Sequence, residues 1–239
     1  MLFVCSRAEH EMKKLFAFGC SFTNYRWSTW ADILGVHYDE YQNWGQSGAG
    51  NHYIFNSVME ADQRHHFGPT DTVIVCWTST HREDRYTDRW QTLGNIYYTD
   101  IYTKEYKQEI TNRGCLVRDI AFIKATKLLL ENRPGVDWKF LSMHNMQHWD
   151  LWKTTDADHD VVDLYQDVFD CIGPSFRETL FPEQWPDRED PHPTPAEHLL
   201  YLDKVMPGCV TDLNIRATIA QESANLFKNR TGMCNQQRL

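Results

Sequence analysis

A serine that could carry chemistry stands near the start of the chain, directly after a short apolar segment. Residues 15–18 read Leu-Phe-Ala-Phe, and the small residues that follow are Gly19, Cys20, Ser21 and Thr23. A buried strand that ends in a tight turn presents such side chains at the carboxyl edge of an open α/β sheet, where ligands bind. Ser21 is therefore the candidate centre of chemistry.

A serine hydroxyl is a poor nucleophile at neutral pH and needs three kinds of partner. An imidazole must accept its proton, a carboxylate must orient that imidazole, and N–H donors must stabilise the oxyanion that forms. The chain contains histidines, carboxylates and a glycine-rich segment at 43–51 whose amides could face an anion at the start of a helix. A serine-dependent reaction is therefore chemically possible.

Alternating strands and helices are predicted to position these groups. Apolar runs predict strands at 15–18, 72–77 and 138–143, and periodic apolar residues predict helices at 28–35, from 51 onward, 116–129, 161–169, 196–205 and 213–227. Residues 86–113 show weak periodicity and are expected to form an excursion over the sheet. This alternation predicts a parallel sheet in a three-layer α/β/α sandwich.

Four segments together resemble the SGNH (GDSL-like) hydrolase family, over roughly residues 14 to 210. They are the serine turn at 19–23, the glycine loop at 43–51, the polar turn at 78–80 and the Glu-Asp-Pro-His-Pro loop at 189–193. The resemblance implies a flavodoxin-like fold with a five-stranded parallel sheet. The last loop and the helix after it are similar to phage and marine-microbial members of this family.

The resemblance also implies roles for single residues. Ser21 is expected to be the nucleophile and His192 the general base, with the amides of Ser21 and Gly48 in the oxyanion hole. Asp190 is favoured as the acid that orients His192, and Glu189 is the alternative. Further candidates for the oxyanion hole or for substrate binding are Asn51, Ser79 and Arg82.

Two positions depart from the family pattern. Cys20 stands where the family has an aspartate beside the serine, and Thr78 or Ser79 stands where it has an asparagine that donates to the oxyanion. Losing one such donor can cost about 10²–10³ in rate. Arg82 could bind a carboxylate or phosphate of a substrate, although a solvated arginine is the ordinary interpretation.

Composition excludes several other classes of protein. The chain of 239 residues has a formal net charge of −9, which disfavours nucleic-acid binding. Its seven cysteines are isolated and odd in number, so neither a disulfide framework nor a zinc site is expected. His144, His148 and the acidic residues at 156–160 suggest a metal site only weakly, because the H-E-x-x-H pattern is missing. No metal or other cofactor is expected.

The chain shows no apolar run long enough for a membrane helix and no signal-peptide core, so a cytoplasmic location and no membrane partner are expected. Residues 1–11 are interpreted as an extension, residues 12–230 as one domain and residues 231–239 as a tail. The sequence does not indicate an oligomeric state.

The expected function is hydrolysis of an ester, with a short acyl chain or an O-acetylated carbohydrate as substrate, through an acyl-enzyme. Two alternatives stay open. One is a non-catalytic SGNH-like protein with a binding or virion-associated structural role, which the missing asparagine favours. The other is an acyltransferase that uses the same residues.

Overall fold

The structure, a computed structural model, describes residues 12–147 and 156–236, and the side chains in those ranges except 156–158 and 227–236. The expected extension at 1–11, His148 of the suggested metal site and the end of the expected tail, 237–239, lie outside the described residues. The last helix runs to Gln236, so the described part of that tail is helical.

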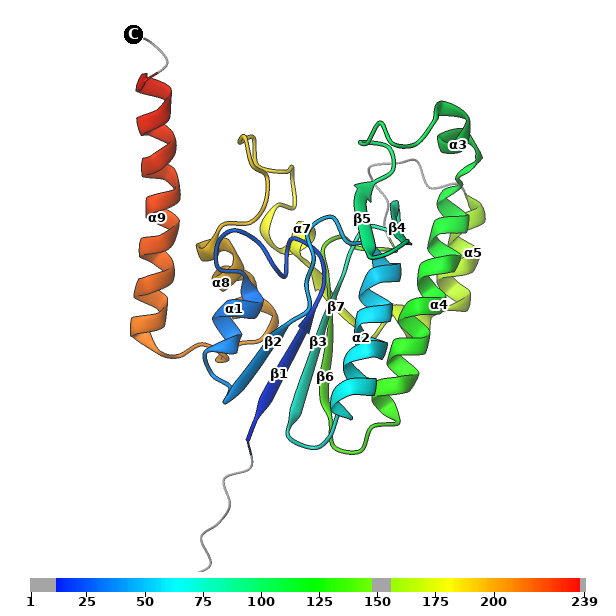
Figure 1. Ribbon diagram of the computed structural model, residues 1–239, viewed down its shortest axis with the longest axis horizontal. Helices are drawn as coiled ribbons and strands as arrows, with labels where there is room; N and C mark the ends of the chain where they lie inside the picture. Colours follow the sequence, from blue (N-terminus) through cyan, green and yellow to red (C-terminus); the bar gives the residue numbers. More distant parts are fainter. Residues whose placement is uncertain (1–11, 148–155, 237–239) are drawn as a thin grey trace, which may run out of the picture.

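A five-stranded parallel sheet forms the centre of the molecule (Figure 1). Its order is β2-β1-β3-β6-β7, and each neighbouring pair is parallel. This is the strand order of flavodoxin-like folds, in which ligands bind at the carboxyl ends of the strands where the chain reverses direction across the sheet. The predicted α/β class and the five-stranded parallel sheet are confirmed. The strands are β1 (Lys14–Phe18), β2 (Glu40–Asn43), β3 (Asp71–Trp77), β6 (Asp137–Ser142) and β7 (Ile172–Ser175).

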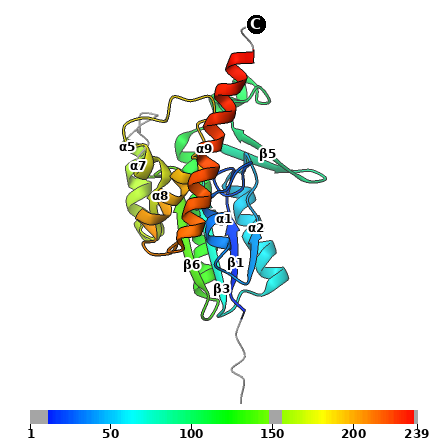
Figure 2. The same cartoon turned by 90° about the vertical axis from the view of Figure 1, so that its left-hand side faces the viewer.

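Helices cover both faces of the sheet (Figure 1). On one face α2 (Asn51–His65) packs against α4 (Asn112–Glu131). On the other face α1 (Trp30–Gly35) packs against α8 (Pro195–Val205), and α9 (Leu213–Gln236) lies outside α8 (Figure 2). The predicted three layers are therefore present. None of the helices in the described residues is both long and apolar enough to cross a membrane.

Several element boundaries differ from those predicted. The cap of α1 is Thr29, whose amide donates to the Asp32 carboxylate at 2.8 Å, and not Ser28. The helix expected at 161–169 is divided into α5 (Asp156–Leu164) and α6 (Gln166–Phe169), and α7 (Phe176–Leu180) follows β7 directly. The other predicted helices are present with shifted ends.

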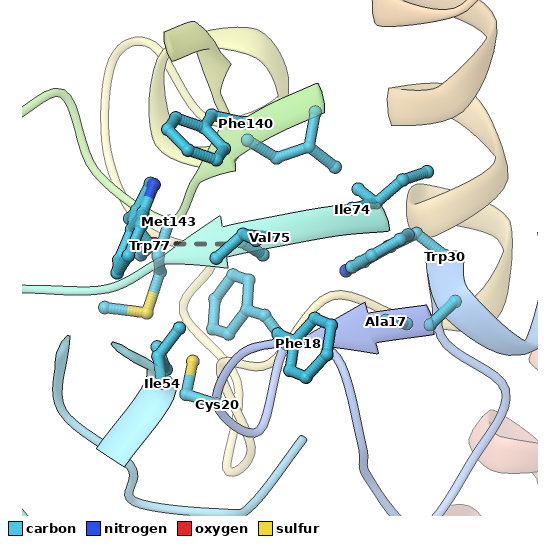
Figure 3. Close-up of a cluster of buried hydrophobic side chains, with 14 of the residues drawn as sticks. Ala17, Phe18, Cys20, Trp30, Ile54, Ile74, Val75, Trp77, Phe140 and Met143 are labelled. Carbon is cyan, nitrogen blue, oxygen red and sulfur yellow. Dashed lines mark hydrogen bonds between the residues drawn. The ribbon is translucent and has the colours of Figure 1, made fainter. Parts of the chain in front are cut away.

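The central strands are buried on both faces. Leu15, Phe16, Ala17 and Phe18 of β1 are fully buried, as is the apolar run of β3 from Val73 to Trp77. Figure 3 shows Trp30 of α1 pointing toward Ala17 and Ile74 on this core. Because the core encloses β1 and β3, the turns that leave their carboxyl ends start from fixed positions.

The expected excursion contains a small antiparallel hairpin and one short helix. Strands β4 (Arg82–Tyr86) and β5 (Trp90–Asn95) form the hairpin, and α3 (Lys104–Glu109) follows it. Strand β4 contacts α2, and in Figure 1 the hairpin lies beyond the upper end of that helix. The excursion thus extends the same sheet-centred unit at the edge where the serine turn lies.

Candidate active site

Ser21, His192 and Asp190 form a hydrogen-bonded chain. His192 Nε2 lies 2.9 Å from Ser21 Oγ, and His192 Nδ1 lies 2.7 Å from Asp190 Oδ1. Both distances are within hydrogen-bond reach for a base and the group it serves. The structure therefore brings together three residues that span 171 positions of the chain.

Asp190 is held by four donors. Its Oδ1 accepts from the His192 ring and from the His192 amide at 3.0 Å, and its Oδ2 accepts from Tyr25 Oη at 2.7 Å and from Arg26 Nη2 at 2.6 Å. Burial opposes ionisation of Asp190, but the hydrogen bonds from Tyr25 and from the amide and ring of His192 outweigh it and lower the pKa of Asp190 to about 2. Asp190 is thus ionised throughout the physiological range.

An ionised carboxylate only accepts hydrogen bonds, so the shared proton must sit on His192 Nδ1. The neutral ring then presents Nε2 as an acceptor toward Ser21 Oγ. This is the tautomer that a general base for Ser21 requires. Glu189, the alternative acid, is exposed, and Asp190 takes the position beside the ring.

Burial lowers the pKa of His192, while the hydrogen bond and charge of Asp190 raise it and the charges of Arg82 and Arg26 lower it again. The net shift is downward. His192 therefore remains a free base to a lower pH than an ordinary histidine.

Aromatic rings fix the plane of the imidazole. The Tyr25 ring stacks on His192 with centroids 4.1 Å apart and planes inclined by 20°. Phe22 approaches the same ring, with centroids 5.7 Å apart. The Arg26 guanidinium lies 4.8 Å from the centroid of the Trp27 ring. The segment after Ser21 thus orients the histidine that serves it.

The loop that carries His192 is tied at several points. Arg188 donates to the carbonyls of Asp190 (2.9 Å) and His192 (2.6 Å) and forms a two-pronged ion pair with Glu197 of α8. Trp27 Nε1 donates to the carbonyl of the next residue, Pro193, at 2.8 Å. These contacts hold the loop against both α8 and the serine segment.

The serine turn depends on Gly19. A Cβ at this residue would lie 2.1 Å from Thr23 Oγ1, so a larger side chain would displace Thr23. The Thr23 and Asn24 amides donate to the Cys20 carbonyl at 2.9 and 3.1 Å and close the turn. Ser21 is 3% exposed.

The side chain of Cys20 is fully buried and belongs to the core cluster. Figure 3 shows the Cys20 side chain among the buried apolar side chains, near Ile54. A cysteine is compatible with this position, because a free thiol packs as a small hydrophobic group. The departure from the family's aspartate therefore leaves the triad geometry intact.

The glycine loop is joined to the serine turn and to the hairpin. Gln46 N donates to the Gly19 carbonyl at 3.0 Å, and the Gly48 carbonyl accepts from Gly94 N at 3.0 Å. Gly48 has a φ of +78°, and a Cβ there would lie 2.6 Å from the Thr92 carbonyl oxygen. Only glycine fits this contact without moving the loop.

Both expected oxyanion donors retain an unused N–H. Within the described part of the chain, neither the Ser21 amide nor the Gly48 amide donates a hydrogen bond. Buried or partly buried amides are normally paired, so two unused amides on adjoining loops are consistent with donors reserved for a ligand.

The amides at the start of α2 are already occupied. Asp84 of the hairpin accepts from Gly50 N and from Tyr53 N, each at 2.8 Å. The helix start was expected to face an anion, and that anion is a carboxylate of the protein itself. Asp84 therefore connects the start of α2 to β4 through these two hydrogen bonds.

The Asn51 side chain also forms hydrogen bonds within the protein. Its amide oxygen accepts from Thr78 N at 2.8 Å, and its amide nitrogen donates to the Thr78 carbonyl and to Asp119. The side chain is fully buried. Asn51 thus joins α2 to the end of β3, and its side chain does not reach Ser21.

The hydroxyls of the polar turn after β3 form only long hydrogen bonds. Ser79 is 9% exposed and its Oγ accepts from the His81 amide at 3.4 Å. Thr78 Oγ1 donates to Met143 Sδ at 3.7 Å. Within the described residues, neither hydroxyl forms a hydrogen bond with Ser21.

Arg82 is not the solvated arginine that was the ordinary interpretation. It is partly buried, Nη1 donates to the Ala49 carbonyl at 3.0 Å and Nη2 lies 3.6 Å from Met143 Sδ. Its charge contributes to lowering the pKa of His192. Arg82 thus places a cation beside the triad.

The suggested metal site is not assembled in the described residues, where no three His, Cys, Asp or Glu side chains gather to hold an ion. His144 instead contacts the Trp185 ring, with centroids 5.5 Å apart. Two cavities, of about 200 and 400 Å³, lie beside β7 and beside α4, and neither is lined by Ser21 or His192.

Sequence reasoning missed the residues that support the triad. Tyr25, Arg26 and Arg188 contact Asp190 or its loop, but none belongs to a recognisable spacing. The one available signal was position, because Tyr25 and Arg26 follow Ser21 closely and Arg188 directly precedes the acidic pair.

Comparisons with known proteins give one solved structure to report. No protein-family model and no curated protein matches the chain. The chain is similar in structure to a member of the lipolytic protein G-D-S-L family from Veillonella parvula DSM 2008, at 15% identity and a TM-score of 0.40, over 80% of this chain and 96% of that one.

Proposed function

We propose that this protein is a serine ester hydrolase that acts through an acyl-enzyme. The observation that carries the proposal is the hydrogen-bonded chain from Ser21 through His192 to Asp190. Its tautomer, the low pKa of Asp190 and the two unused amides fit the requirements of an activated serine.

In the first half of the reaction, Ser21 Oγ attacks the ester carbonyl carbon and its proton passes to His192 Nε2. The carbonyl oxygen becomes an oxyanion, and the Ser21 and Gly48 amides donate to it. Asp190 remains ionised and stabilises the imidazolium. When the intermediate collapses, the C–O bond to the alcohol breaks and His192 Nε2 returns the proton to the departing alkoxide.

In the second half, His192 takes a proton from water as the water oxygen attacks the acyl-enzyme carbonyl. Collapse then breaks the bond to Ser21 Oγ, His192 protonates that oxygen, and a carboxylic acid leaves. The acyl-enzyme would be the same for an acyltransferase, in which an alcohol replaces water.

Hydrolysis of p-nitrophenyl acetate tests the proposal. The wild-type protein is expected to turn over the ester, and Ser21→Ala is expected to lose at least about 10³-fold in kcat, because the nucleophile is removed. Ser28→Ala is the matched control, a nearby serine outside the triad, and should retain wild-type turnover. Equal rates for Ser21→Ala and wild type would refute the proposal.

A further inference from the structure

Two arginines near the triad, Arg82 and Arg177, have no carboxylate partner among the residues that the structure describes. Arg82 contacts a carbonyl and a thioether, and its Nε is buried without an acceptor. Arg177 lies over the Trp185 ring, 5.6 Å from its centroid, and its Nη1 is buried without an acceptor. Burying a cation without an anion is costly.

Other partly buried arginines are paired. Arg118, Arg133 and Arg188 each form an ion pair with an aspartate or glutamate. The chain as a whole carries a net charge of −9, so the lack of an ion pair at Arg82 and Arg177 does not reflect a general shortage of acidic residues. Arg82 and Arg177 are therefore the partly buried arginines of the described residues that form no ion pair.

Met143 and His144 link the two arginines. Met143 Sδ contacts Arg82, and the Met143 carbonyl accepts from Arg177 N at 3.2 Å. His144 is the next residue, and burial together with the charges of both arginines lowers the pKa of His144 to about 4. His144 is thus neutral and leaves the positive charge uncompensated.

Carboxylates near these elements are engaged elsewhere. Glu178, beside Arg177, accepts from Asn145 at 2.6 Å and from Ser175 at 3.0 Å. Asp84, on the strand of Arg82, holds the start of α2. Burial raises the pKa of Asp84 and the charge of Arg82 lowers it, so the two groups interact at a distance. Among the described residues, however, neither acid forms an ion pair with Arg82 or Arg177.

A continuous path of aromatic contacts leads from Arg177 to the residue beside Ser21. The Trp185 ring beneath Arg177 lies 6.1 Å from the Phe22 ring, and Phe22 lies 5.7 Å from His192. Phe22 also directly follows Ser21. Arg177 is thus connected to His192 through two rings, and the charge of Arg82 acts on His192 directly.

We propose that Arg82 and Arg177 form a subsite for an anionic group, a carboxylate or phosphate, on the substrate. The inference rests on the proposed function for the ester bond, and it narrows the substrate class to esters that carry a negative charge near the scissile carbonyl. Guanidinium groups suit this task because they donate to carboxylate and phosphate oxygens in pairs.

Binding of stable amide analogues tests the subsite. The succinic acid mono-amide of p-nitroaniline carries a carboxylate, whereas the butyric acid amide is neutral and of similar shape. In calorimetric titrations of the wild-type protein, the anionic amide is expected to bind about 10- to 100-fold more tightly, the range for one or two charge-assisted hydrogen bonds. Phenyl phosphate forms a third arm that distinguishes a preference for phosphate from one for carboxylate.

Substitutions assign the preference to the arginines. Arg82→Gln and Arg177→Gln should each lower the ratio of anionic to neutral affinity by about tenfold or more. Arg64→Gln is the control, because Arg64 is an exposed arginine of α2, and it should keep the wild-type ratio. Thermal unfolding of each variant shows whether it remains folded, and Arg177→Gln decides the question if Arg82→Gln is unfolded.

Equal affinity of the wild-type protein for anionic and neutral probes would overturn the subsite, as would a preference that survives both substitutions. Because these amides are not hydrolysed, the outcome is independent of catalysis by Ser21. Loss of ester turnover alone would overturn the proposed function and leave the subsite standing.

Discussion

At the scale of single residues, the acid of the triad is the most specific assignment. Asp190 lies 2.7 Å from the His192 ring and Glu189 is exposed. Asp190→Asn should lower kcat/KM for p-nitrophenyl acetate by about 10³-fold or more, because the amide cannot stabilise the imidazolium and favours the wrong tautomer. The neighbouring control Glu189→Gln should stay within about twofold of wild type. A large loss in Glu189→Gln with little loss in Asp190→Asn would assign the role of the acid to Glu189.

The pH dependence of kcat/KM reports on His192. Only the neutral ring accepts the Ser21 proton, so activity is present above the pKa of His192 and is lost as the pH falls through it. Since burial lowers this pKa, the acidic limb of the profile should have its midpoint below about 6.5, the value of an unperturbed histidine. A midpoint above that value would contradict the environment described for the ring.

The sequence singled out the side chains that the structure joins by hydrogen bonds, but not the groups that hold them. Ser21 and His192 lie in segments with distinctive composition, a serine after an apolar strand and a histidine in a proline-rich loop. Tyr25 and Arg26 act through a contact with Asp190 across 165 and 164 positions. Such a pairing leaves no local pattern, because it arises only when the two segments fold together.

At the scale of elements, the hairpin of β4 and β5 holds the glycine loop, which is also hydrogen-bonded to the serine turn. Gly48→Ala should lower kcat by about 10²-fold or more, because its Cβ would meet the Thr92 carbonyl and move the proposed oxyanion donor. Gly208→Ala is a matched control, since Gly208 has a φ of +81° but open space around its Cβ position. It should lose about 1 kcal/mol of stability and no activity.

Kinetics with p-nitrophenyl acetate and urea unfolding of both variants separate these effects. If Gly48→Ala and Gly208→Ala lost the same stability and neither lost activity, the Gly48 amide would not belong to the oxyanion hole. A loss of kcat confined to Gly48→Ala would support it.

Edge strands mark the limit of prediction at this scale. The apolar runs of β1, β3 and β6 are buried and were predicted from sequence. Strand β2 reads Glu-Tyr-Gln-Asn and β7 reads Ile-Gly-Pro-Ser, and neither has an apolar run because each has a neighbour on one side only. Polar residues and proline are tolerated at such edges, so the pattern that identifies a central strand is missing.

At the scale of the whole molecule, buried histidines make stability depend on pH. Burial first, and the nearby His192 second, lower the pKa of His198 to about 3, and His198 Nδ1 is buried without a partner. The unfolded chain binds this proton near pH 6.5, so stability is present above that pH and is lost as the pH falls toward the folded value. The pKa of His144 is lowered as well, to about 4, so His144 also makes the protein less stable as the pH falls.

Between pH 7 and pH 5 each of these histidines should remove about 2 kcal/mol from the free energy of unfolding. His198→Phe should remove one such contribution, because the ring contacts with Phe22 and Phe176 can be kept by an aromatic side chain that does not titrate. Urea unfolding of both proteins at the two pH values measures the difference. An unchanged pH dependence in His198→Phe would show that His198 is not responsible.

The molecule as a whole assembles its site from segments that are distant in sequence. The serine turn follows β1, the glycine loop follows β2, and the histidine loop precedes α8. The strand order places the ends of β1 and β3 beside each other, which is the arrangement that gathers ligands in flavodoxin-like sheets. The sequence predicted this order of segments and named Arg82 as a candidate for substrate binding. The position of Arg177 and the buried, unpaired nitrogens of both arginines emerged only from the described part of the structure.

The central claim is that Ser21 is a nucleophile activated by His192. Reaction of the protein with a fluorophosphonate probe, followed by mass spectrometric mapping of the adduct, tests this claim most directly. The account predicts one covalent adduct per chain, on Ser21 Oγ, which is lost in Ser21→Ala and strongly slowed in His192→Gln. Absence of an adduct from the wild-type protein, or an adduct on another serine, would contradict it.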